Sequence, residues 1–282
     1  MEFPGLLVTA SGVVERAEPL LRADDLGVLR GDGVFERLLI VDGEPDLFEE
    51  HLRRLERSAA MTGLRLPPTE SWRKAVAIAC QEVRDLENMS LRMIVTRGVD
   101  ESGEEPTWYL LVDQVGPEVL AKRSEGIAVV ALDRGLDPGL TERAPWLLMG
   151  AKTLSYAVNM AAQRWAKEHG ADDAIFVAPD GQVLEAPTSA VVIARGRTLL
   201  SPPPSVGILP SITLGRLFRA ASEAGWETRL EPFLLDDLHS ADGVWLVSSI
   251  RLASRVHTLD GKALTCIAPH EEIAALSGPF PG

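Results

Sequence analysis

The succession of strand-like and helix-like patterns is the feature that most limits what this chain can fold into. Two strands in GVFERLLIVDGEPDLF meet at the turn Asp42-Gly43. Helical spacing of apolar residues follows in LFEEHLRRLERSAAMTGL, which we expect to end at Gly63, and again in TESWRKAVAIACQEVRDL, where Thr69 or Ser71 is the expected N-cap. Strands and helices are therefore mixed without strict alternation, which favours an α+β fold over a doubly wound parallel sheet.

A change of pattern near the middle of the chain predicts two domains. The stretch VGPEVLAKRSEG is rich in turns, and GIAVVALDRG begins a second set of strands. We expect an N-terminal domain over residues 1–114, a linker over 115–124 and a C-terminal domain over 125–282. The C-terminal half is predicted to contain a helix over residues 154–169 and a series of strands that includes QVLEA.

Charge and composition narrow the classes of partner and site. A formal net charge of −13 argues against nucleic acid and anionic membranes as partners, although a pocket can be locally basic and take an anionic small molecule. No apolar run approaches the length of a membrane span, and the N-terminus lacks a signal-peptide pattern, so we expect a cytoplasmic protein. The two cysteines and five histidines show no ligand spacing, so we expect no metal.

One lysine lies in unusually apolar surroundings. Lys152, in MGAKTLSYAVN, has Leu154, Tyr156 and Val158 near it and no acid close by. The ordinary explanation is a half-buried lysine that extends its amine to the surface. The functional explanation is an amine that reacts with carbonyl groups, because desolvation favours the neutral, nucleophilic form of a lysine.

Three further stretches bear on the choice. Glu185 is expected at the end of a strand, GILPSITLGRLF offers N–H groups and hydroxyls at a helix N-terminus, and Arg54 in HLRRLERSA is a candidate cation. Taken alone, each has a simpler explanation as an exposed turn acid, a helix cap or a solvated helix charge. Together with Lys152 they supply what a pyridoxal phosphate site needs: an acid for the pyridine nitrogen, and amides and a cation for the phosphate.

Six motifs in a fixed order carry a resemblance to a known family. They are GDGVFERLLIVDG, HLRRLERSA, the lone apolar lysine, LEAPTS, GILPSIT and DGVWLVSSIRLASRV, and they span residues 20–262. In this order the chain resembles the fold-type IV pyridoxal-phosphate enzymes, or class IV aminotransferase family, which comprises branched-chain aminotransferases, D-amino acid aminotransferases and 4-amino-4-deoxychorismate lyases. The stretches around Lys152 and Ser249 are most similar to the lyase branch.

The resemblance implies a fold, a cofactor and an assembly. The fold would be a two-domain α+β structure similar to D-amino acid aminotransferase, with a small N-terminal α/β domain and a larger C-terminal pseudo-barrel domain. The cofactor would be pyridoxal 5'-phosphate, and the chain would form a homodimer. Lys152 would bond to the cofactor and Glu185 would pair with the pyridine nitrogen. The phosphate would be bound by Arg54, Ile212, Thr213 and Ser249.

On the substrate side the resemblance is less complete. It implies substrate contacts for Ile250 and Arg251, in the turn after Ser249, and for Arg97 in VTRG. It implies a substrate contact more loosely for Tyr156, because the family tyrosine stands at a different offset from the lysine. A threonine of many relatives is replaced by Arg37, and the alternation of a strand puts Arg37 on the face opposite Glu36, so only one of the two can face the site. Leu214 and Ala190 also depart from the family pattern, which leaves the substrate open.

The function expected from the resemblance is that of an aminodeoxychorismate lyase, which releases pyruvate and forms 4-aminobenzoate for folate synthesis. An aminotransferase acting on D-amino or branched-chain amino acids is the alternative, and a non-catalytic ligand-binding member is a third reading. Aminodeoxychorismate carries two carboxylates, and burying an unpaired carboxylate is costly, so a lyase pocket needs local cations. The candidates are Arg97, Arg251 and Arg37, in that order.

Overall fold

A computed structural model describes residues 3–99 and 105–279. The chain forms two compact units, which we call the N-terminal unit (Met1–Gly116 and Ala151–Tyr156) and the C-terminal unit (Pro117–Gly150 and Ala157–Gly282). Most of the segment expected to be a linker is helix α4, Pro117–Ser124. Residues 151–156 belong to the N-terminal unit although the chain on both sides of them belongs to the other.

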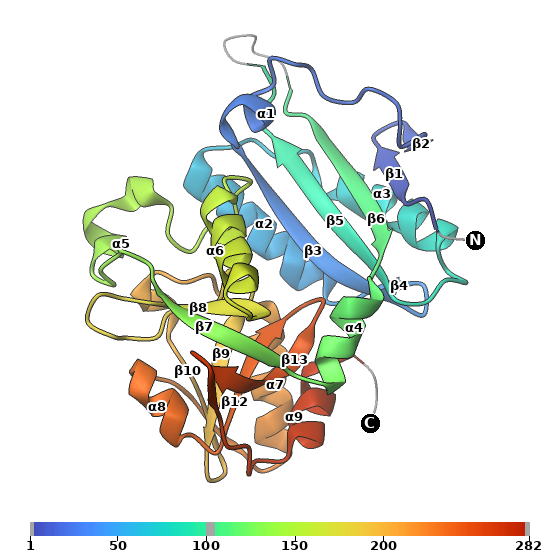
Figure 1. The fold of residues 1–282 in the computed structure, drawn as a ribbon. Coiled ribbons are helices and arrows are strands. Elements are labelled where there is room, and N and C mark those ends of the chain that lie inside the picture. Colours follow the sequence, from blue (N-terminus) through green and yellow to red (C-terminus); the bar gives the residue numbers. More distant parts are fainter. Residues whose placement is uncertain (1–2, 100–104, 280–282) are drawn as a thin grey trace. The chain divides into compact units, whose positions relative to one another are not determined.

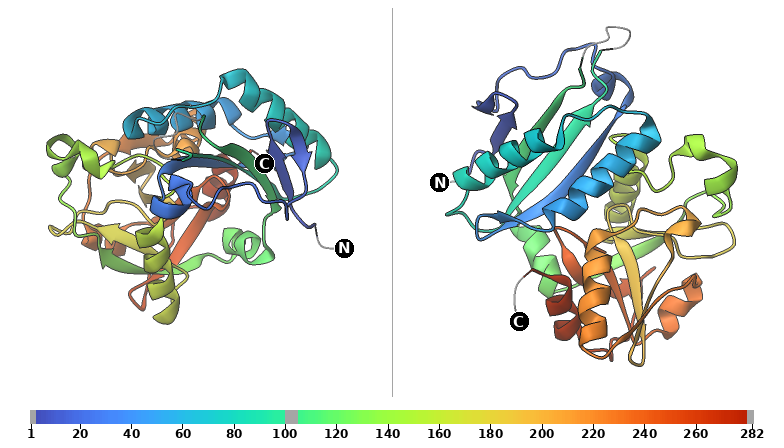
Figure 2. Two further views of the ribbon diagram at one scale, coloured as in Figure 1. Left: turned by 90° about the horizontal axis from the view of Figure 1, so that it is seen from above. Right: turned by 180° about the vertical axis from the view of Figure 1, so that it is seen from behind.

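The N-terminal unit is built on an antiparallel sheet with the strand order β2-β1-β6-β5-β3-β4. Helices α2 and α3 lie across one face of this sheet (Figure 2). The elements of the unit are β1 Leu6–Thr9, β2 Gly12–Val14, α1 Leu26–Arg30, β3 Gly33–Val41, β4 Glu44–Pro45, α2 Phe48–Thr62, α3 Thr69–Glu82, β5 Met89–Thr96 and β6 Trp108–Gln114.

Alternation along the strands places the core of this unit between the sheet and its helices. Val34 and Leu38 of β3 are fully buried in one cluster with Leu55 of α2 and Trp72 of α3. Phe35, Arg37 and Leu39 therefore point to the other face of the sheet, because successive side chains of a strand alternate. That second face carries Phe35, against whose ring the Lys152 amine lies.

Local signals predict several boundaries of this unit correctly. The chain reverses direction at Asp42 and Gly43, which both have positive φ and form the turn of the hairpin. Helix α2 ends at Gly63, which adopts the left-handed conformation. The expected cap of α3 is wrong: Thr69 is already helical, and the N-cap is Pro68, which makes no side-chain cap bond.

The C-terminal unit contains a mixed sheet with the order β11-β10-β9-β12-β13-β7-β8, and β14 pairs with β13 (Figure 1). Pairs β10–β11, β13–β7 and β7–β8 are parallel, and the other pairs are antiparallel. After α4 its elements are β7 Ile127–Asp133, α5 Leu140–Arg143, η1 Pro145–Leu147, α6 Ala157–Glu168, β8 Asp173–Val177, β9 Ala190–Arg195, β10 Thr198–Ser201, η2 Pro204–Val206, α7 Ile212–Glu223, β11 Glu227–Leu230, α8 Leu235–Ser240, β12 Gly243–Ser248, β13 Leu252–Leu259, β14 Lys262–Ala263 and α9 His270–Ser277.

Both faces of this second sheet are covered. One face packs on α7 and α9 around Trp245, and the other is buried in a cluster around Ile193 and Val244. Two expected elements differ. The stretch QVLEA pairs only through isolated bridges, such as Val177 with Val183, and forms no continuous strand. The helix expected from residue 154 begins at Ala157 because the residues before it pair with β3.

Candidate active site

Lys152 is held at the edge of the N-terminal sheet by main-chain hydrogen bonds. The N–H of Phe35 donates to the carbonyl of Lys152 at 3.1 Å, and the N–H of Leu154 donates to the carbonyl of Gly33 at 2.8 Å. Val34 faces Thr153 in an antiparallel bridge, so Lys152 lies directly opposite Phe35 on the same face of the sheet. The segment comes so close that a Cβ on Gly33 would meet Leu154 at 2.6 Å.

The amine of Lys152 lies against two aromatic rings of the same unit. Its Nζ is 4.5 Å from the ring centroid of Phe35 and 5.7 Å from that of Tyr156, and the two rings meet edge to face at 5.4 Å. The main-chain N–H of Lys152 also donates to the buried hydroxyl of Ser58 at 3.0 Å. Backbone pairing and ring contacts therefore fix both ends of this side chain, as a site that positions an amine requires.

Arg54 belongs to a buried cluster with Glu36 and His51. Nε and Nη2 of Arg54 donate to the two carboxylate oxygens of Glu36 at 2.6 and 2.7 Å, and Nδ1 of His51 lies 2.7 Å from Glu36 Oε2. Glu36 and His51 are almost fully buried, and the Arg54 side chain is 10% exposed. Arg54 is thus not the solvated helix charge of the simpler explanation.

The ionisation of this cluster follows from its geometry. Burial raises the pKa of Glu36, but the charge and hydrogen bonds of Arg54 and the hydrogen bond of His51 outweigh it and lower that pKa to about 2. For His51 the balance is reversed, because burial, together with the charges of Arg54 and Lys152, lowers its pKa more than the hydrogen bond and charge of Glu36 raise it. The cluster therefore holds a carboxylate, a guanidinium and a neutral imidazole at neutral pH.

Sequence reasoning missed the part that Glu36 and His51 play here. The available signal was the i, i+3 spacing of His51 and Arg54 on α2, which puts both side chains on one helix face, together with a charged residue at an inward position of β3. No signal in the sequence indicated that Phe35 faces Lys152, because that pairing joins residues far apart in the chain.

In the C-terminal unit, Glu185 is fixed by main-chain bonds. Its Oε2 accepts from the N–H of Leu209 at 3.1 Å, and its carbonyl accepts from the N–H of Phe176 at 2.8 Å. Leu209 lies two residues after Gly207, in the loop that leads to α7. Gly207 has φ +89°, and a Cβ at this position would meet the Met149 side chain at 2.2 Å. The carboxylate is therefore positioned by the loop that precedes α7.

Three of the four residues expected at the phosphate, Ile212, Thr213 and Ser249, lie at or beside the N-terminus of α7. Ser211 caps the helix by accepting from the N–H of Leu214 at 3.2 Å, and Ile212 and Thr213 form the first helical positions. The hydroxyl of Thr213 lies 3.2 Å from that of Ser249, in the turn between β12 and β13. First-turn N–H groups have no partner within their helix, so the arrangement suits an anion.

Two of the three arginines expected at the substrate are already paired with carboxylates. Arg97 donates to both oxygens of Asp32 at 2.7 and 3.1 Å, and to the carbonyls of Thr62 and Gly63. Arg251 pairs with buried Asp173 at 2.8 Å and donates to the hydroxyl of Ser189 at 2.7 Å.

The remaining residues expected at the substrate differ in their surroundings. Arg37 donates to the hydroxyl of Ser90 at 3.1 Å and makes no ion pair with any described residue. The carbonyl of Ile250 accepts from Arg123 at 2.6 Å. Of the expected substrate residues, the N-terminal unit thus contains Arg37, Arg97 and Tyr156, and the C-terminal unit contains Ile250 and Arg251.

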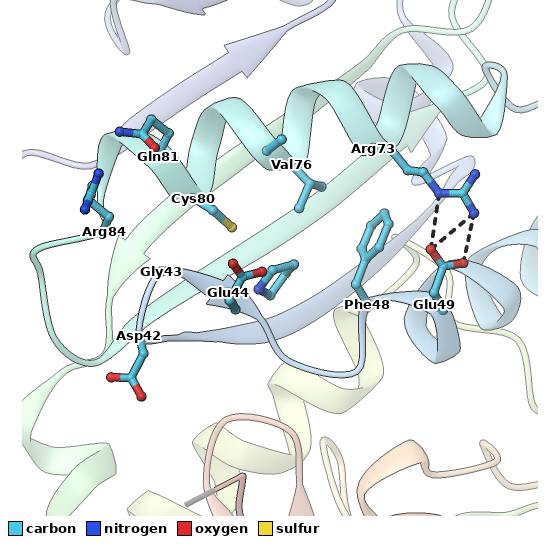
Figure 3. Close-up of a pocket in the computed structure, with 12 residues that line it drawn as sticks. Asp42, Gly43, Glu44, Phe48, Glu49, Arg73, Val76, Cys80, Gln81 and Arg84 are labelled. Atoms are coloured by element: carbon cyan, nitrogen blue, oxygen red, sulfur yellow. Dashed lines mark hydrogen bonds and ion pairs between the residues drawn. The ribbon is translucent and has the colours of Figure 1, made fainter.

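A separate cavity of about 450 Å³ lies on the outside of the N-terminal unit, between the β3–β4 turn, the start of α2 and α3 (Figure 3). The Arg73 guanidinium and the Glu49 carboxylate meet at its rim in a pair of about half-exposed side chains. None of the residues expected to act lines it. Among the described residues there is no cluster of potential metal ligands and no helix long and apolar enough to cross a membrane.

Comparisons with known proteins agree with the fold and the motif order. A Mycobacterium tuberculosis protein described as a bifunctional aminodeoxychorismate lyase / D-amino acid transaminase is 45% identical over 92% of this chain and 93% of its own. A hypothetical aminotransferase of that organism, solved in a PLP-bound form, matches with a TM-score of 0.93 at 45% identity over 97% of both chains.

Two further solved structures support the match. The same mycobacterial aminotransferase is also known in a form with alpha-ketoglutarate and PMP bound, and it matches with a TM-score of 0.93 at 45% identity over 96% of this chain and 97% of that chain. A fold IV-transaminase of Curtobacterium pusillum matches with a TM-score of 0.89 at 36% identity over 96% of this chain and 95% of that chain. The expected α+β fold of the fold-type IV enzymes is therefore confirmed.

The family itself follows from the extent of the sequence match. The family model described as Amino-transferase class IV matches residues 33–259. This range includes the Lys152 segment, α7 and the β12–β13 turn. Members of this family depend on pyridoxal phosphate. The chain belongs to the class IV aminotransferase family.

Proposed function

We propose that this enzyme is a pyridoxal 5'-phosphate-dependent aminodeoxychorismate lyase, which releases pyruvate from 4-amino-4-deoxychorismate and forms 4-aminobenzoate for folate synthesis. The observation that carries the proposal is the placement of the Lys152 amine over Phe35 by the pairing of residues 152–154 with β3. The lyase assignment is supported by the 45% identity to the mycobacterial lyase/transaminase. By the same resemblance, the protein would be a cytoplasmic homodimer.

The residues present fit the cofactor. Lys152 supplies an oriented amine, Glu185 a carboxylate fixed by a backbone N–H, and Thr213 and Ser249 two hydroxyls beside a helix N-terminus. Arg54 supplies a guanidinium whose orientation is set by Glu36. An amine, an acid for a ring nitrogen and an anion-binding helix terminus are the groups that pyridoxal phosphate chemistry requires.

Each residue then has a task in the reaction. The cofactor supplies a carbonyl that bonds the substrate amine and a ring that accepts the electron pair left when a proton is removed. Lys152 would hold the cofactor through its amine, and the same amine, once free, would take the proton from the carbon that bears the substrate amine. Glu185 would keep a proton on the pyridine nitrogen. Arg54, Thr213, Ser249 and the N–H groups of Ile212 and Thr213 would hold the phosphate.

Transamination of D-amino acids is the second candidate, and the description of the mycobacterial relative favours it specifically. The two reactions share the removal of the proton and differ in the next step. In the lyase the bond between the substrate ring and the enolpyruvyl oxygen breaks and the group leaves as pyruvate, whereas in the aminotransferase the amine is transferred and a 2-oxo acid is released. The residues that bind the substrate beyond its amine therefore decide between them.

A pair of assays on the purified protein tests the proposal. Pyruvate release from aminodeoxychorismate is measured beside amino transfer from a panel of D- and L-amino acids to a 2-oxo acid. The lyase proposal predicts pyruvate release that is faster than transfer from every amino acid of the panel. Faster transfer from D-alanine would replace it with the aminotransferase, and the absence of both activities in protein that carries the cofactor would refute both.

A further inference from the structure

The face of the N-terminal sheet that carries Phe35 also carries Arg37. The two residues are separated by one position on β3, and alternation puts them on the same face, opposite the α2 and α3 side. Lys152 lies opposite Phe35 on this face, with its amine over the ring. A lysine amine and an arginine are thus arranged along one strand, within a single unit of the chain.

Arg37 has an environment that is unusual for an arginine. It is half-buried, Ser90 is its hydrogen-bond partner, and its Nε is buried with no partner among the described residues. Burial, with a smaller contribution from the charge of Arg92, lowers the pKa of Arg37 to about 10, and Asp113 opposes this only in part. A guanidinium in such a place costs stability unless an anion binds to it.

The surroundings of Arg37 are also rich in positive charge. Arg92 faces Arg37 across the β3–β5 pair. Asp113 is shared by Arg92 at 3.6 Å and Arg16 at 2.6 Å. Arg16 and Arg92 therefore share one carboxylate, and Arg37 lies near them without an ion pair to it, on a chain whose formal net charge is −13. Asp113 is committed to Arg16 by the shorter distance, so Arg37 lacks a counter-ion of its own.

The other two arginines expected at the substrate differ on this point. Arg97 is held by both oxygens of Asp32, and Arg251 is held by buried Asp173. A substrate carboxylate that bound to either would have to compete with a carboxylate already in place. No such competitor contacts Arg37 among the described residues, which reverses the order of preference drawn from the sequence.

We infer that Arg37, with Arg92 beside it, binds a carboxylate of the substrate that is remote from the reacting amine. The inference rests on the proposed function, because it takes Lys152 as the reacting centre. Arg37 is two residues beyond Phe35, a separation of roughly 6–7 Å along a strand. The carboxylate of a simple amino acid is attached to the carbon that bears the amine and does not reach so far, so Arg37 would select amines and 2-oxo acids that carry a second carboxylate.

Substitution of Arg37 tests this selection. Arg37→Met keeps the aliphatic bulk and removes the charge, Arg37→Lys keeps the charge without the planar fork, and Arg53→Met removes an exposed arginine of α2 as a matched control. We expect Arg37→Met to raise KM for aminodeoxychorismate by about tenfold or more relative to KM for D-alanine, as the loss of a charge-assisted bond predicts. Arg37→Lys should restore part of the difference, and Arg53→Met should change neither constant.

A binding measurement separates this inference from the proposed function. Glutarate and butyrate do not react, so calorimetry reports their affinity for the cofactor-loaded enzyme without turnover. Glutarate should bind more tightly than butyrate to the wild type, and Arg37→Met should remove most of that preference. Equal effects of Arg37→Met on both ligands, and on both values of KM, would overturn the role of Arg37 even in an active lyase. A wild type that is inactive but prefers glutarate through Arg37 would instead refute the proposed function alone.

Thermal unfolding distinguishes a substrate-binding role of Arg37 from a purely structural one. Arg37 makes one hydrogen bond and no ion pair among the described residues, so Arg37→Met should leave Tm of the ligand-free protein unchanged or raise it. A marked fall in Tm together with uniform loss of activity would show that Arg37 stabilises the sheet and does not bind substrate.

Discussion

Glu36 binds Arg54 through both of its carboxylate oxygens, at 2.6 and 2.7 Å, from a position on β3 that is fully buried. Two parallel bonds fix the plane of the guanidinium as well as its position. Arg54 is thus oriented by its own unit before any phosphate binds, and its exposure of 10% leaves it little freedom to turn elsewhere. The consequence is that the affinity for the cofactor should depend on Glu36, which would not itself touch the phosphate.

Glu36→Gln should weaken the binding of pyridoxal phosphate. The neutral amide loses the charge-assisted bonds, worth about 1.5–3 kcal/mol, that orient Arg54, so the apparent dissociation constant should rise about tenfold. The spectroscopic titration of apoenzyme with cofactor measures it, and Glu49→Gln, at an exposed pair with Arg73, is the control. If Glu36→Gln and the control bind the cofactor equally well, Arg54 is not the phosphate ligand.

Acid should destabilise the protein through the same cluster. Burial lowers the pKa of His51 against the opposing effect of Glu36. The stability that neutral His51 contributes is therefore fully present above pH 6.5, the ordinary pKa of histidine, and is lost as the pH falls through the lowered pKa of the folded protein. For Glu36, burial raises the pKa but Arg54 lowers it more, to about 2, so its contribution is present above 4.5 and is lost as the pH falls toward 2.

Urea unfolding as a function of pH measures these contributions. The free energy of unfolding should fall on acidification from about pH 7, and His51→Gln should flatten the first part of that fall. A wild type that becomes more stable between neutral and mildly acidic pH would contradict the charge state assigned to the cluster.

Lys152→Ala should abolish turnover and leave the fold intact. The hydrogen bonds that hold residues 152–154 on β3 come from the main chain, so the Lys152 side chain can be removed without loss of the pairing. Turnover should fall by on the order of 10³-fold or more, as for other residues that form the covalent bond. Borohydride reduction followed by peptide mapping should modify Lys152 in the wild type, and Lys74→Ala, on the exposed side of α3, should behave like the wild type.

Glu185→Gln should keep the cofactor bound and slow the chemistry. An amide cannot hold a proton on the pyridine nitrogen, and loss of such a partner costs about 10²–10⁴-fold in rate. Saturating cofactor and single-turnover kinetics isolate the chemical step. An unchanged rate constant would mean that another acid pairs with the ring.

Sequence reasoning succeeded where the determining interactions are local. The turn at Asp42-Gly43 and the end of α2 at Gly63 depend on positive φ, which short motifs reveal. Sequence reasoning failed where pairing between residues that are far apart in the chain determines the structure. Residues 154–156 precede a helix and were expected to belong to it, but Thr153 and Leu154 pair with the edge of β3 and the helix begins at Ala157.

The candidate site divides in the same way. Lys152 stands out by its apolar surroundings, whereas Arg54 was singled out only by the resemblance of the ordered motifs to a known family. Among the arginines expected at the substrate, Arg97 ranked first because a glycine loop follows it. In the structure Arg97 pairs with Asp32, and this pairing depends on how two segments that are distant in the sequence pack together. The orientation of Arg37 followed from strand alternation, whereas its lack of a counter-ion depends on how Asp113 is shared.

The pairing of residues 152–154 with β3 brings the segment 151–156 into the N-terminal unit and makes that unit discontinuous along the chain. During synthesis, β3 emerges from the ribosome more than a hundred residues before the segment that completes its edge. The edge of β3 that later receives Lys152 must therefore remain open until residues 117–150, the first part of the C-terminal unit, have been made. A fragment ending at Gly116 would expose that edge permanently and would lack Lys152, so the two units cannot be separated by a single cut into an intact pair. The position of the lysine thus ties the completion of the first unit to the translation of the second.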